Sequence, residues 1–198
     1  MARVWGRVLS CALACAVLAG ASALSAEPTA ATARTQILFL GTAGGPPLRF
    51  DRAEPSTLLI VNGHEYLIDC GIGTARRLVE SGISSSTITT IFFTHHHADH
   101  DMGLADVMAA DFFDGGGQGD AGPFHIYGPP ETKQLVDAGF QYIAVGFRPF
   151  AAAPPTAYRM RGESFVSPFV THEIARDGLV FDDGNIRVTA AENSHYVM

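Results

Sequence analysis

The stretch Thr94-His95-His96-His97-Ala98-Asp99-His100-Asp101 predicts the fold more strongly than any other part of the chain. It contains the pattern His-x-His-x-Asp-His, formed by His95, His97, Asp99 and His100. Alternate side chains of an extended segment point to the same side, so His95 and His97 can bind one ion. Asp99 and His100 follow the turn and are expected to point toward a second ion. Neutral imidazole and carboxylate suit zinc and similar divalent metals. The alternative is a polar loop in which histidines cluster by chance.

The sequence on either side of this motif places it between a strand and a helix. Residues 88–94, with the apolar run Ile91-Phe92-Phe93 just before the motif, predict a strand that ends at the motif. After the motif, apolar residues recur at helical spacing until the pattern fades near Phe113. These residues are Leu104, Val107, Met108 and Phe112. The motif is therefore predicted to lie at the end of a strand and on the first turn of a helix.

Three strands are predicted before the motif. Residues 36–40 are apolar and end in the glycine loop 41–47, which is either an ordinary turn or a wall of the active site. Residues 57–61 and 64–69 flank Asn62-Gly63. This dipeptide between two strand patterns predicts a hairpin with a type I′ turn.

The rest of the chain alternates helices and strands at first and then favours strands. Residues 72–81 predict a helix with Leu78 and Val79 facing inward and Gly82 at its end. The other predicted elements are a strand at 124–127, a helix from Gly128 to about Phe140, and strands at 164–174 and 179–191, the last bent at Asp183-Gly184. This order of elements predicts an α/β (α+β) fold.

Residues 1–26 predict a secretory signal peptide. Arg3 and Arg7 give the segment a positive start, the following run is apolar, and small residues after it offer cleavage sites. The alternative is an uncleaved membrane anchor, although the apolar run is short for a span. Residues 27–35 then predict a linker, and residues 36–198 a single domain. The expected location is the periplasm or the exterior of the cell.

Charge and cysteine content narrow the class of partner. The 198-residue chain has a net charge of −7, which becomes −9 once the leader with its two arginines is removed. Lys133 is the single lysine. Binding to nucleic acid depends on Lys and Arg side chains that neutralise phosphates, so a small-molecule or ester substrate is expected instead. Cys70 is the one cysteine beyond the leader, so no disulfide is expected within the domain.

The histidine motif resembles the signature of the metallo-β-lactamase fold hydrolases. Residues 40–47, 66–71 and 126–130 resemble the ribonuclease Z-like branch of that superfamily, which includes phosphodiesterases and arylsulfatases. The resemblance implies an αββα sandwich. It also implies a zinc-dependent hydrolase that uses a metal-bound hydroxide on a phosphodiester, sulfate ester or lactone, and the predicted leader adds the expectation that this hydrolase is exported. Two Zn²⁺ ions are expected in an intact site, and no stable membrane span is expected after cleavage of the leader.

The resemblance further implies which residues hold the metal. His95, His97 and His195 would bind the first zinc ion, a three-histidine set that leaves room for water. Asp99 and His100 would contribute to the second ion. Asp99 is the expected catalytic residue, because it can orient the nucleophile or accept a proton from it. The alternative for His195 is an exposed loop histidine.

Asp69 is the residue that the resemblance assigns to orientation of the centre. Ligand histidines commonly donate their other N–H to such a carboxylate, although a turn or helix-cap role for Asp69 remains the alternative. The histidines outside the motif lack ligand spacing and are expected to be structural; they are His64, His125 and His172. His96 is expected to point away from the ion, because side chains alternate along an extended segment.

Two ligands of the family pattern have no counterpart in the sequence. The pattern requires a bridging aspartate and a final histidine downstream of His195, whereas this sequence ends at Met198. The expectation is therefore the N-terminal portion of a longer hydrolase, with the C-terminal half of the sandwich missing and an apolar sheet face uncovered. The alternative function is a catalytically inactive remnant that binds at most one metal ion. A Cys70 nucleophile is a third hypothesis and lacks a clear base partner.

Overall fold

The computed structural model describes residues 35–45, 47–114, 124–151 and 169–195. All of them belong to the compact unit that begins at Ala33. The predicted leader and almost all of the predicted linker lie outside the described residues, and so do residues 164–168 of a predicted strand. Within the described ranges, every helix is too short or too polar to cross a bilayer.

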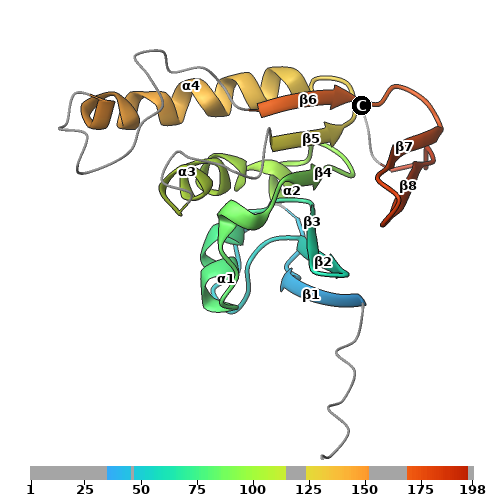
Figure 1. Cartoon of the computed structure of the whole chain (residues 1–198), viewed down its shortest axis with the longest axis horizontal. Helices are drawn as coiled ribbons and strands as arrows, with labels where there is room; N and C mark the ends of the chain where they lie inside the picture. Colours follow the sequence, from blue (N-terminus) through green and yellow to red (C-terminus); the bar gives the residue numbers. More distant parts are fainter. Residues whose placement is uncertain (1–34, 46, 115–123, 152–168, 196–198) are drawn as a thin grey trace, which may run out of the picture. The chain divides into compact units, whose positions relative to one another are not determined.

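One six-stranded sheet forms the centre of the fold (Figure 1). Its strands lie in chain order, with β1 antiparallel to β2, β2 antiparallel to β3, and the remaining pairs parallel. The strands are β1 (Thr35–Gly41), β2 (Ser56–Val61), β3 (His64–Ile68), β4 (Thr90–Phe92), β5 (Phe124–Gly128) and β6 (Phe169–Glu173). The strand predictions in these regions are thus confirmed, although β4 ends two residues before the expected Thr94.

The predicted hairpin between β2 and β3 is confirmed. Val61 pairs with His64, which leaves a two-residue loop. Asn62 and Gly63 both have positive φ, at 50° and 83°, as a type I′ turn requires. The local sequence therefore determines the register of the sheet where it begins.

Helices cover one face of this sheet. They are α1 (Thr74–Glu80), the short η1 (Ser85–Thr87), α2 (Ala98–Asp101), α3 (Leu104–Asp114) and α4 (Thr132–Ala151). Neighbouring strands align one apolar side chain each on that face, and all are fully buried in the core; they are Leu58, Leu67, Ile91 and Ile126. The helices contribute Leu78, Val107, Met108 and Val136 to the same core.

Two helix predictions are wrong in detail. The helix after β5 continues past Phe140 to Ala151, because its apolar face continues through the buried residues Ile143 and Phe147. Val79 was expected to face inward and is 61% exposed, since the core contact of this short helix is made by Leu78.

The strand predicted at residues 179–191 is a hairpin. It consists of β7 (Gly178–Asp182) and β8 (Arg187–Ala190), which pair antiparallel in a separate two-stranded sheet (Figure 1). Asp183 explains the reversal, because its side chain accepts hydrogen bonds from the backbone N–H groups of Asn185 and Ile186 at 2.9 and 2.8 Å. Such an Asx turn, with Gly184 at φ 80°, turns the chain back rather than bending one strand.

The sheet face opposite the helices is only partly covered. Ile37 and Phe39 in β1 alternate with inward-facing residues and are 59% and 68% exposed. Nearer the middle of the sheet, Phe181 of β7 lies against the rings on β3 to β5. The described residues therefore form one mixed sheet with helices on one face, which is the arrangement expected of half of an αββα sandwich.

Candidate metal centre

Three histidines from two distant parts of the chain meet at one point. A ligand nitrogen of His95, of His97 and of His195 lie within 4.8 Å of one another. Their ring centroids are 4.5 to 5.0 Å apart. His95 lies in the loop after β4, His97 caps α2 in an extended conformation, and His195 follows β8 by five residues. The structure thus brings together the three residues predicted to hold the first ion.

The environment of His95 fits a metal ligand. Its Nε2 atom is buried and has no hydrogen-bond partner among the described residues, while Nδ1 lies 3.0 Å from the hydroxyl of Thr94. Burial lowers the pKa of His95, and the positive charges that His100 and His97 can carry lower it further. A neutral imidazole with an unused buried lone pair is the form that binds zinc.

Asp99 and His100 lie beside this cluster on α2. The rings of His95 and His100 are 4.1 Å apart, and an Asp99 oxygen lies 3.7 Å from His100 Nε2. Asp99 also accepts a 2.7 Å hydrogen bond from the backbone N–H of Gly45. Burial raises the pKa of Asp99, but this bond, a further backbone bond and the nearby histidines outweigh burial and leave the pKa below its usual value. Asp99 is therefore a carboxylate near neutral pH.

Asp69 holds the loop and one histidine of the motif in place. It accepts hydrogen bonds from the N–H of Thr94 at 2.8 Å, from the Thr94 hydroxyl at 2.9 Å, and from His100 Nδ1 at 2.8 Å. A carboxylate can only accept, so His100 carries its proton on Nδ1 and keeps the Nε2 lone pair available. The helix-cap alternative fails, because Gly73 is the N-cap of α1 and no side chain caps that helix.

Backbone segments cross closely beneath the motif, a feature that was not expected from the sequence. A Cβ on Gly71 would lie 2.2 Å from the carbonyl oxygen of Asp99, and one on Gly103 would lie 2.2 Å from the carbonyl oxygen of Gly71. Cys70 links the same segments, since its N–H bonds to His100 and its carbonyl to Gly103. In the sequence, the only hint of this crossing is that Gly71 follows Asp69 and Gly103 follows Asp101 by two residues each. The sequence does not show that these two segments cross.

The other histidines lie outside the cluster. His96 bonds through Nε2 to the hydroxyl of Thr132 at 2.8 Å and through Nδ1 to Asp101 at 3.2 Å. His125 and His172 bond to each other at 2.9 Å across β5 and β6. The contact between His125 and His172 joins two strands, as expected of structural histidines, and the bonds of His96 to Thr132 and Asp101 turn it away from the cluster, as the alternation predicted.

Cys70 is unsuited to act as a nucleophile. Its side chain is fully buried in the core. Burial also raises the pKa of its thiol far above the usual value. Because the thiolate is the reactive form, this environment argues against the cysteine mechanism.

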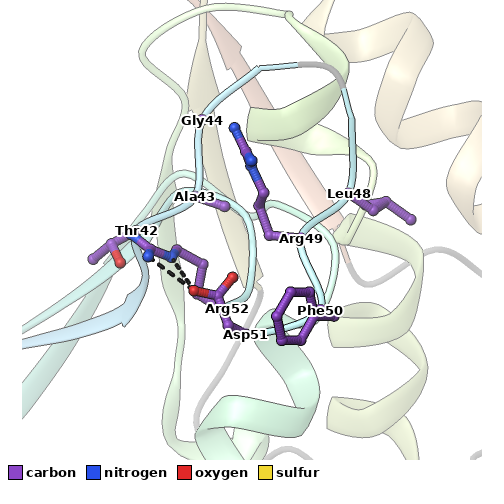
Figure 2. A pocket seen from close by; sticks show the side chains of 8 residues that line it. All are labelled: Thr42, Ala43, Gly44, Leu48, Arg49, Phe50, Asp51 and Arg52. Carbon is purple, nitrogen blue, oxygen red and sulfur yellow. Dashed lines mark hydrogen bonds and ion pairs between the residues drawn. The ribbon is translucent and has the colours of Figure 1, made fainter.

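The loop between β1 and β2 lines an open cavity. The cavity has a volume of about 470 Å³ and is lined by residues 42–44 and 48–52 (Figure 2). Arg52 is paired with Asp51 at 2.9 Å. The guanidinium of Arg49 has no hydrogen bond or ion pair with another described residue, and Figure 2 shows it extending toward the arm that carries Gly44. The Gly45–Asp99 bond joins this loop to the centre.

Comparisons with known proteins agree with this fold. A family model described as "Anti-Pycsar protein Apyc1" matches residues 35–136. A ribonuclease Z of Mycobacterium marinum is 31% identical over 166 residues, which are 81% of this chain and 54% of the relative. Human tRNase Z, short form (ELAC1), aligns with a TM-score of 0.56 at 25% identity over 77% of this chain and 57% of its own. The metallo-β-lactamase fold protein YhfI from Bacillus subtilis shares the fold, with a TM-score of 0.53 at 15% identity over 75% of this chain and 50% of its own.

The sheet, the histidine cluster and these similarities define a metallo-β-lactamase fold protein of the ribonuclease Z branch, as the resemblance implied. Within that class, the chain belongs to the family described as Anti-Pycsar protein Apyc1. The chain spans about half the length of the curated relative from Mycobacterium marinum. The relatives are named as ribonucleases, which weighs against the expectation that nucleic acid is not a partner.

Proposed function

We propose that this chain carries the site of a zinc-dependent hydrolase that cleaves an ester-type substrate at the histidine cluster. The observation that carries the proposal is the buried, unpartnered Nε2 of His95 beside His97 and His195. Three imidazoles that leave a fourth position open are typical of catalytic rather than structural zinc. A zinc ion bound there supplies Lewis acidity that lowers the pKa of coordinated water to about 7.

The residues of the chain would have two roles, metal binding and proton transfer. His95, His97 and His195 would hold the first ion, and Asp99 with His100 would contribute to a second. Asp99 lies where it can orient the attacking water and accept its proton, and the Gly45 N–H keeps its carboxylate in place.

The cavity in the β1–β2 loop, which Gly45 connects to Asp99, favours substrates with a negatively charged ester group. Arg52 is paired directly with Asp51, whereas Arg49 interacts with the same carboxylate only through its charge and makes no ion pair with a described residue. A guanidinium can bind phosphate or sulfate oxygens in a bidentate manner, whereas a neutral lactone offers no such group. Phosphodiesters and sulfate esters are therefore the preferred candidates within the ester class, and a nucleotide or RNA phosphodiester belongs to the same chemistry.

Zinc titration and a small substrate panel test the proposal. Purified protein should bind zinc, and His195→Ala should lower the affinity at least about tenfold, because a ligand is lost. His64→Ala is the matched control, since His64 is exposed and lies outside the cluster. Asp99→Ala should abolish hydrolysis of a chromogenic phosphodiester or sulfate ester while the protein stays folded, with only a small fall in unfolding temperature from loss of the Gly45 bond. Wild-type zinc affinity in His195→Ala, or full turnover in Asp99→Ala, would contradict the proposal.

A second candidate is an inactive chain that binds a single ion. It is favoured by one observation: among the described residues, Asp99 and His100 belong to no group of three potential ligands within reach of one ion. One equivalent of zinc without turnover on any ester of the panel would support this candidate. Two equivalents with turnover would exclude it.

We also propose export from the cell, supported by the composition of residues 1–26. The test is expression in a bacterial host followed by fractionation and N-terminal sequencing. A mature N-terminus between residues 22 and 27 in the periplasmic fraction is expected. An intact Met1 on cytoplasmic protein would contradict export.

A further inference from the structure

His195, the third histidine of the cluster, follows a hairpin whose strands are not hydrogen-bonded to any described strand of the main sheet. Among the described strands, β8 pairs only with β7, and the pair forms its own sheet. His195 follows the end of β8 by five residues. In contrast, His95 and His97 follow β4 by three and five residues, and β4 is a strand in the middle of the six-stranded sheet. The position of His195 relative to its two partners therefore depends on the side chains that fix the β7–β8 hairpin.

Phe181 of β7 makes the apolar part of this attachment. Its ring lies edge-on to Tyr66, Phe92 and Tyr127, with centroid distances of 6.1, 5.5 and 5.4 Å. These rings belong to β3, β4 and β5 and lie on the sheet face opposite the helices, because their neighbours Leu67, Ile91 and Ile126 face the core. Edge-to-face rings at this separation attract one another beyond the effect of burial alone.

Side-chain hydrogen bonds fix the turn of the same hairpin to the β2–β3 hairpin. The hydroxyl of Tyr66 donates to Asp183 at 2.5 Å. Asn185 donates to that hydroxyl at 2.9 Å and to the carbonyl oxygen of Val61 at 3.0 Å. Asn185 also accepts a 2.6 Å bond from Asn62 in the β2–β3 turn. The β7–β8 hairpin is thus attached to the main sheet through the ring of Phe181 and through its Asp183–Asn185 turn. Tyr66 takes part in both attachments.

We propose that Phe181 and Tyr66 are positioning residues of the metal centre, which hold the β7–β8 hairpin on the sheet so that His195 reaches His95 and His97. This inference rests on the proposed function, in that it takes the three histidines to be zinc ligands. Without the attachment, His95 and His97 remain in place, because β4 and its sheet neighbours hold them. The centre then has two protein ligands in place of three.

The connection between attachment and site is short on both sides. Phe92 is the last residue of β4 and lies three positions before His95, so the same strand carries the ring that contacts Phe181 and the first ligand. On the other side, only Ile186, β8 and four further residues separate the Asp183–Asn185 turn from His195. A shift of the hairpin is therefore passed on to His195 and not to the pair on the main sheet.

The test measures zinc affinity of the full 198-residue chain by competition with a chromophoric chelator. Phe181→Ala is expected to lower the affinity about 10- to 100-fold, the range typical for loss of a residue that orients a ligand. His195→Ala should cause a loss of similar size. The double variant should bind zinc no more weakly than His195→Ala alone, because Phe181 acts through His195. Leu179→Ala is the matched control, since Leu179 lies on the same strand and is 64% exposed.

A second variant and a second measurement distinguish a shift of the hairpin from unfolding of the whole domain. Tyr66→Phe removes only the hydroxyl, so the fold should persist while zinc affinity falls by about threefold or more, as expected when hydrogen bonds of about 1 kcal/mol are lost. In zinc-free protein, hydrogen exchange should rise in residues 178–190 and stay unchanged in β3 to β5. Unchanged zinc affinity in both variants, or losses that add in the double variant, would overturn the inference. If His195→Ala itself binds zinc like wild type, it is the proposed function that fails.

Discussion

Removal of the Asp69 carboxylate tests how the motif is held. Asp69→Ala deletes the acceptor of three hydrogen bonds: two from Thr94 and one from His100. Hydrogen bonds to charged groups contribute about 1.5–3 kcal/mol each, and neutral ones about 1 kcal/mol. The carboxylate is buried, so part of this gain is offset by its desolvation. Asp69 also has φ 57°, a conformation that costs alanine about 1 kcal/mol more than aspartate or asparagine. A net loss of about 3–4 kcal/mol is expected.

The measurement is urea-induced unfolding of the zinc-free protein in the presence of a chelator. In a thermal unfolding experiment on a domain of this size, the same loss of free energy corresponds to a fall in unfolding temperature of roughly 6–16 °C. Asp69→Asn is the matched control, because asparagine tolerates positive φ and keeps an acceptor for Thr94; it should lose about 1–2 kcal/mol. Thr94→Ala combined with Asp69→Ala should cost less than the sum of the single changes, since they share the same bonds. Equal stability of Asp69→Ala and wild type, or of the two Asp69 variants, would refute the reasoning.

Three further predictions concern residues that support the fold around the centre. Gly71→Ala should destabilise the fold by roughly 2–4 kcal/mol in thermal unfolding, because its Cβ would lie 2.2 Å from the carbonyl oxygen of Asp99; a loss below about 0.5 kcal/mol would show that the crossing relaxes. Burial, and then the charge of His125, lowers the pKa of His172, so the unfolded chain binds more protons below about pH 6.5. The stability contribution of His172 should be complete above that pH and decline as pH falls, and His172→Asn should flatten this slope in urea titrations of zinc-free protein. Cys70 should resist iodoacetamide until urea unfolds the chain, since its thiol is buried and its pKa is raised; rapid alkylation of native protein would contradict this.

The attachment of the β7–β8 hairpin also bears on the exposed sheet face. Ile37 and Phe39 remain exposed at the β1 edge, while Phe181 covers the middle of the same face. Substitution of both β1 residues by threonine keeps strand propensity and removes apolar surface. The double variant should be more soluble at equal zinc affinity, as measured by light scattering and chelator competition. Aggregation equal to that of the wild type would show that this edge does not drive association.

The sequence by itself determined the features that depend on residues close to one another along the chain. Asn62-Gly63 set the β2–β3 turn, because only particular residues adopt positive φ at both turn positions. The alternation of His95 and His97, followed by a helical pattern, was enough to place the motif between a strand and a helix. Periodicity and turn chemistry act over a few residues, so they can be read directly from the order of amino acids.

Only the tertiary structure decided which distant groups meet. Asp69 and Thr94 are 25 positions apart, and Gly45 and Asp99 are 54 positions apart, yet each pair shares a hydrogen bond. The helix after β5 extends past Phe140 for the same reason, since its continuation is stabilised by burial against the core rather than by local propensity. A periodic pattern shows that a side chain will face some partner, but the partner is chosen by how the sheet, the helices and the hairpin pack together.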